Sequence, residues 1–149
     1  MAARSHDHGF SLVEVLVALV VMAVGMLGIA GLYVEGLQAG RSAAYRSVAI
    51  TLAADMADRI RANPAGSYPG TGPGASMGCV NGGRDCSADE LAADDWYRWL
   101  GDLQQRMPAG SSAVIEKQDL AAASQYTITL SWPEAGQEMP ANYALALQL

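Results

Sequence analysis

The chain has 149 residues, a net charge of −6, 51% hydrophobic residues and 16% charged residues. This length allows one membrane segment and one small domain. An acidic chain without a basic stripe argues against a nucleic acid partner.

An apolar run begins near the N-terminus and extends from Phe10 to Val34, with one carboxylate, Glu14, near its start. As a helix, a run of this length can cross a hydrocarbon core of about 30 Å. A charge inside it costs roughly 2.5–3.5 kcal/mol on insertion scales and usually marks function. If the chain is cut after Gly9, the new α-amino group of Phe10 is a cation that can pair with Glu14. An ordinary secretory signal fits less well, because the run is too long and the preceding residues are nearly neutral.

The helical period continues beyond the apolar run, and Asn63-Pro64 ends it. We therefore expect one helix over residues 11–62. Residues 10–35 would form its membrane or filament-core part, and residues 36–63 its amphipathic part. The apolar stripe of this second part faces a globular domain, and its members recur at steps of three and four residues: Tyr45, Val48, Leu52, Met56 and Ile60.

Residues 64–86 are rich in Gly, Pro, Ser and Asn, which predicts a long loop at the start of the domain formed by residues 64–149. Cys79 and Cys86 suit a disulfide bond if this part lies in an oxidising compartment. The rival interpretation is a metal site. Two cysteines cannot supply four ligands when the only histidines, His6 and His8, precede the apolar run.

A second helix is expected over residues 87–107, with Ser87 as its N-cap and an apolar stripe that includes Trp96 and Trp99. The acidic pairs Asp89-Glu90 and Asp94-Asp95 are interpreted as its solvated face. Apolar residues then alternate over residues 113–116, 126–132 and 142–149, which predicts three strands. The expected fold class is α+β, with a long N-terminal helix packed on a small antiparallel sheet.

The N-terminal pattern resembles the class III signal of type IV prepilins: a short polar leader (residues 1–9) ending in Gly9, then Phe10, then Glu14 at the fifth position of an apolar helix. The resemblance implies cleavage between Gly9 and Phe10 by a prepilin peptidase, and N-methylation of Phe10 by the same enzyme. It also implies that Glu14 takes part in assembly by pairing with the N-terminus of a neighbouring subunit.

Three further features resemble the PilV-type minor pilins: the helix end from Leu52 to Pro64, the Cys79–Cys86 loop, and the strand that ends at Trp132. Members of this group prime pilus assembly. The resemblance implies other minor and major pilins as partners. It also implies an inner-membrane location with a periplasmic domain, followed by the pilus fibre or its tip. The alternative is a minor pseudopilin of type II secretion, similar to the I-type subunit.

A membrane-tethered enzyme or binding module is the rival from another class. Catalysis would need a nucleophile–base pair, a carboxylate dyad or a metal cluster, and no histidine remains after the leader is removed. We therefore expect no enzymatic activity, no cofactor, no metal and no small-molecule substrate. A ligand-binding role for the loop of residues 64–86 stays open.

Overall fold

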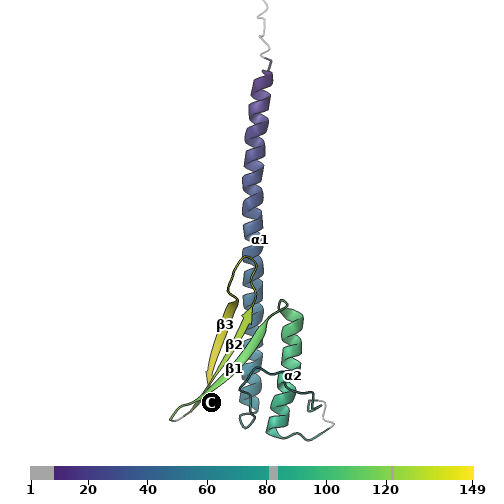
Figure 1. Cartoon of the computed structure of the whole chain (residues 1–149), viewed down its shortest axis with the longest axis vertical. Helices are drawn as coiled ribbons and strands as arrows, with labels where there is room; N and C mark the ends of the chain where they lie inside the picture. Colours follow the sequence, from purple (N-terminus) through teal and green to yellow (C-terminus); the bar gives the residue numbers. More distant parts are fainter. Residues whose placement is uncertain (1–8, 81–83, 122) are drawn as a thin grey trace, which may run out of the picture. The chain divides into compact units, whose positions relative to one another are not determined.

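The computed structural model describes residues 9–80, 84–121 and 123–149. The rest of the leader, residues 1–8, lies outside the described residues. The elements follow in the order α1 (Leu12–Ala62), α2 (Ala88–Arg106), β1 (Ser112–Asp119), β2 (Ser124–Trp132) and β3 (Ala141–Gln148) (Figure 1). The chain has the predicted α+β class, and its contacts divide it into two compact units, the second of which begins at Arg41.

The first unit contains the apolar part of α1. The helix begins one residue later than predicted. An 18-residue window within it has a mean hydropathy of 2.7, and none of the residues in that window is buried. Large apolar side chains are exposed all around it, among them Leu12, Leu27 and Ile29. By length and composition, this is the one helix in the described part of the chain that can cross a membrane.

The second unit contains the amphipathic part of α1, which ends at Ala62 as predicted, just before Asn63-Pro64. The predicted stripe residues Leu52, Met56 and Ile60 are fully buried, and Tyr45 and Val48 pack partly buried against the same core. Three alanines widen the buried stripe: Ala49, Ala53 and Ala57. Small side chains at these positions leave room for the aromatic rings that come from the rest of the domain.

Helix α2 begins with a capping box, in which the Ser87 side chain accepts the Glu90 N–H and the Glu90 carboxylate accepts the Ser87 N–H. Trp96 and Trp99 are buried and meet edge to face, with ring centroids 5.5 Å apart. The indole N–H of Trp99 donates to the backbone oxygen of Leu52 in α1 at 2.9 Å. Both tryptophans therefore belong to the core, as their place on the apolar stripe of this helix predicts.

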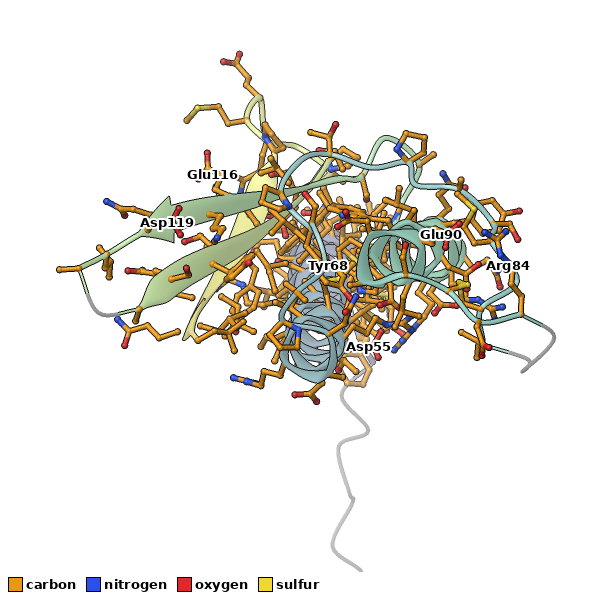
Figure 2. The ribbon with its side chains drawn as sticks, turned by 90° about the horizontal axis from the view of Figure 1, so that it is seen from below. Asp55, Tyr68, Arg84, Glu90, Glu116 and Asp119 are labelled. Atoms are coloured by element: carbon orange, nitrogen blue, oxygen red, sulfur yellow. A yellow bond between two sulfur atoms is a disulfide. The ribbon has the colours of Figure 1, made fainter. Side chains whose placement is uncertain are left out.

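The three strands form an antiparallel sheet in the order β1-β2-β3. The central strand β2 alternates as predicted, and its buried residues are Tyr126, Ile128, Leu130 and Trp132. Strands β1 and β3 each begin one residue before the predicted start, and β2 begins two residues before it. Strand β1 is also four residues longer than the predicted segment of residues 113–116. In the second unit, the sheet and α2 flank the C-terminal part of α1 (Figures 1 and 2).

Candidate functional site

The residues around the predicted cleavage position lie just before and at the start of α1. Gly9 and Phe10 precede the helix, and the Phe10 side chain is 83% exposed. Glu14 lies in the first turn, where its N–H donates to the backbone oxygen of Ser11 at 3.0 Å. A carboxylate in the first turn is favoured by the helix dipole. The Glu14 side chain is exposed and forms no ion pair with another described residue, so its carboxylate is free to meet a cation from outside the chain.

A shallow hollow on this part of α1 is lined by Glu14 and by apolar side chains, namely Phe10, Val15, Ala18, Leu19 and Met22. Its walls come from Phe10, just before α1, and from successive turns of α1, so it is a surface depression and not an enclosed cavity. The only ionisable group in its lining is the Glu14 carboxylate. The arrangement offers one anion inside an apolar surface, which suits packing against another apolar helix that carries a cation.

Cys79 and Cys86 are joined in a disulfide, with their Cα atoms 5.8 Å apart. Residues 81–83, inside the ring that this bond closes, lie outside the described residues. The Cys86 end of the ring runs directly into the capping box of α2, and Arg84 forms an ion pair with Glu90 on the outer side of that helix (Figure 2). The disulfide loop is therefore held at the N-terminus of α2.

The interpretation of Asp94-Asp95 as part of a solvated face is wrong. Both side chains are buried, Asp94 completely. Asp94 accepts the N–H groups of Met77 at 2.7 Å and of Gly78 at 3.0 Å, and its other oxygen accepts Arg98 Nε at 2.8 Å. Burial pushes the pKa of Asp94 up, but Arg98 and the two backbone donors outweigh burial and hold the pKa below its ordinary value.

Asp95 belongs to a second, partly buried cluster, which joins α2 to the end of α1. It accepts the Tyr68 hydroxyl at 2.7 Å and Arg59 Nη1 at 3.1 Å. Arg59 also donates to Asp55 on its own helix at 3.0 Å. Burial, and then the hydrogen bond to Asp95, raise the pKa of Tyr68 above its ordinary value. Figure 2 shows Tyr68 between the two helices.

Asn63 completes the cluster at the end of α1. Its side-chain amide donates to the backbone oxygen of Ala88 at 2.7 Å and to the hydroxyl oxygen of Tyr68 at 3.2 Å. The residue that was expected only to end the helix thus also fastens it to the first turn of α2. The hydrogen bonds of Asn63, Tyr68, Arg59 and Asp95 thus link the end of α1 to the loop and to α2.

The loop of residues 64–80 lies tightly against α2 in front of the disulfide. Gly74 has a φ of 69°, and a Cβ added there would stand 2.3 Å from the backbone oxygen of Ala93. The N–H of Ala75 donates to that same oxygen at 3.1 Å. Only glycine allows this close approach, so the loop packs in a defined position against α2.

Among residues 9–80, 84–121 and 123–149, no group of three or more His, Cys, Asp or Glu side chains is arranged to hold a metal ion. The two acidic clusters instead accept hydrogen bonds from arginine, tyrosine and backbone groups. The spacing of α2 contained a signal for one of them. Asp95 lies three residues after the buried Ala92 and four before the buried Trp99, which places it on the apolar stripe.

Two family models match the chain. Residues 4–30 match the model described as "Prokaryotic N-terminal methylation motif", and residues 31–97 match the model described as "Type IV pilin Tt1218". The two matches adjoin and together include the apolar run, the whole of α1, the disulfide loop and the first half of α2. No curated protein and no solved structure matches the chain.

Proposed function

The chain belongs to the type IV pilins, and from this premise we propose that it is a minor pilin of the PilV type, a structural subunit that helps to prime pilus assembly. The single observation that carries the proposal is the arrangement at the start of α1. There Gly9-Phe10 precedes the helix and the exposed carboxylate of Glu14 lies in its first turn, inside an uncharged apolar run. The finer assignment to the PilV type is supported by the Cys79–Cys86 loop and by the helix end before Pro64.

Processing is the first step of the proposed function. A prepilin peptidase removes residues 1–9 and methylates the new N-terminus at Phe10, and the secondary amine that results remains a cation at neutral pH. The mature chain is held in the inner membrane by residues 10–35, with residues 64–149 in the periplasm. The disulfide supports this orientation, because such bonds persist in oxidising compartments.

Assembly is the second step. As the subunit leaves the bilayer, Glu14 pairs with the Phe10 amine of a neighbouring pilin. An unpaired carboxylate in an apolar setting is costly by several kcal/mol, and a paired one is tolerated. The pair therefore fixes the register between subunits, and the exposed apolar side chains of α1 supply the packing. The partners are the peptidase, the membrane and other minor and major pilins.

Mass spectrometry of the N-terminus, in sheared pili and in membranes, tests both steps. We expect the wild-type chain to begin at methylated Phe10 in both fractions. The Glu14→Leu variant should be cleaved as wild type but depleted at least about tenfold from pili, since one lost pairing worth 1.4 kcal/mol or more suffices for that ratio. Glu35→Leu, which removes an acid outside the Phe10–Val34 run, is the matched control. Normal incorporation of Glu14→Leu would refute the pairing, and an intact leader in pili would refute the processing.

Neighbouring genes separate this proposal from the I-type pseudopilin of type II secretion. Genes for pilus minor subunits beside this one favour the pilus. Loss of secretion, with pili unaffected, in a strain that lacks this chain would favour the pseudopilin instead.

A further inference from the structure

The two outer edges of the sheet are protected very differently. On β1, Ile115 exchanges two backbone hydrogen bonds of 2.8 Å with Gly70, and the charged residues Lys117 and Asp119 follow on the same edge. Covering segments and charges are the usual means by which proteins prevent a further strand from pairing with an edge. The β1 edge is therefore closed.

The β3 edge has none of these protections. Ser124 and Leu149 exchange two bonds of 2.9 Å, so the antiparallel register makes each second residue of β3 point its N–H and C=O away from β2. These residues are Asn142, Ala144, Ala146 and Gln148. All four are exposed, and no described residue forms a hydrogen bond with their backbone groups. From Ala141 to Leu149 there is no charged side chain, no proline and no residue with positive φ.

The side chains along this edge define what can pair with it. On the core face, Ala141, Tyr143 and Leu145 are only partly buried, so the apolar face of the sheet continues to the edge. On the other face, the side chains of Ala144 and Ala146 lie between the amides of Asn142 and Gln148. Beside the start of β3, Glu138 and Met139 are exposed, Met139 by 80%. A strand that completes this edge is thus uncharged where it pairs with β3 and apolar at alternate positions. It carries a basic residue beyond the paired part, where it meets Glu138.

We propose that the free edge of β3 binds an extended strand of another protein of the assembly. The strand runs antiparallel to β3, pairs with the four outward residues, and carries a basic residue near its C-terminal end, opposite Glu138. This is addition of a strand to the sheet, in which backbone bonds supply affinity and alternate side chains supply specificity.

A second copy of the chain does not meet these requirements. Its β1 edge is closed by Gly70 and by charges. Pairing β3 with β3, with both apolar faces on the same side, needs a two-fold axis perpendicular to the sheet. That antiparallel pairing would place Gln148 and Leu149 of the copy, which carry no basic side chain, opposite Glu138. The choice of another protein of the assembly rests on the proposed function.

The test uses the full chain in lipid nanodiscs and a fluorescent peptide with the sequence of residues 141–149 followed by two lysines. This probe has the required alternation and a basic C-terminal end. Ala146→Pro removes an N–H that points away from β2, so it breaks no bond within the sheet. We expect Ala146→Pro to weaken binding of the peptide at least about tenfold by fluorescence polarisation, while the matched variant Ala146→Thr binds as wild type. Glu138→Lys should also weaken binding several-fold.

Equal binding by the Pro and Thr variants would overturn the proposal, as would no binding to the wild-type chain. Undiminished binding of a probe methylated on alternate backbone nitrogens would overturn it too. Self-association of the wild-type chain that Ala146→Pro abolishes would assign the edge to a second copy and overturn the choice of partner. Thermal unfolding of both variants checks their fold. Because the peptide assay contains no pili, its failure leaves the Glu14→Leu result untouched, and the two proposals fail separately.

Discussion

Asp94→Asn tests whether the completely buried carboxylate of α2 holds the disulfide loop in place. The wild-type side chain accepts three hydrogen bonds, two from the backbone of Met77 and Gly78 and one from Arg98. The amide keeps an oxygen for the backbone donors, but it loses the charge and the bond with Arg98. Hydrogen bonds to a charged group are worth about 1.5–3 kcal/mol each. The Arg98 side chain is 36% exposed and can bind water instead, so its hydrogen bond contributes at the lower end of this range.

We therefore expect Asp94→Asn to lower the free energy of unfolding by about 2–3 kcal/mol, and Tm by roughly 10 °C. Urea unfolding followed by tryptophan fluorescence measures the change, because Trp96 and Trp99 are buried on the same helix. Asp102→Asn, an exposed acid of α2, is the control and should change stability by less than about 0.5 kcal/mol. Equal stability of the two variants would refute the role given to Asp94.

The pH dependence of stability follows from the same carboxylate. The folded state holds the pKa of Asp94 below its ordinary value, so its contribution is complete above the ordinary carboxyl pKa of about 3.9 and is lost as pH falls through the lower folded-state pKa. The wild-type chain should thus lose stability more steeply than Asp94→Asn below about pH 4. Parallel curves for the two proteins, measured by urea unfolding from pH 2 to 7, would contradict this assignment.

Three further predictions concern the same part of the domain. Tyr68→Phe removes the buried bond to Asp95 and should cost about 1–3 kcal/mol in urea unfolding, whereas Tyr97→Phe, at an exposed position, should cost almost nothing. Gly74→Ala should be at least about 1 kcal/mol more damaging than Gly78→Ala: both glycines have positive φ, but only at position 74 does the added Cβ collide with backbone. Replacing both cysteines by serine should cost up to about 2.5 kcal/mol, the chain entropy of an eight-residue ring, and reduction of the wild-type protein should reproduce that loss.

The elements of this protein could be predicted because their signals are local. The stripe of Leu52, Met56 and Ile60 and the alternation along β2 depend only on the repeat of a helix or a strand, and the structure buries these residues. The disulfide and the core position of the tryptophans also followed from spacing and composition. In each case, a few neighbouring residues contain the whole pattern.

The carboxylate clusters could not be predicted in the same way, because the partners of each acid are distant in the sequence. Met77 and Gly78 are separated from Asp94 by 17 and 16 positions in the sequence, and Arg59 from Asp95 by 36. Two adjacent acids on a helix usually face water, and nothing in the loop's composition identifies the donors that meet them. The apolar stripe of α2 did place Asp95 on the buried side, but spacing alone names no partner for it.

The loop of residues 64–80 is held in place by hydrogen bonds to neighbouring elements. The N–H of Ser67 donates to the Asp89 side chain, and the backbone oxygen of Tyr68 accepts the indole N–H of Trp96. Further along the loop, Gly70 pairs with β1, and the N–H of Ala75 donates to a backbone oxygen of α2. The Asp94 carboxylate then holds the segment that enters the disulfide ring. Since these bonds end on both α2 and β1, the loop joins two elements that flank α1. A loop fixed in this way keeps the sheet in one position on the helix, so that a strand bound at the β3 edge would be held by a rigid domain.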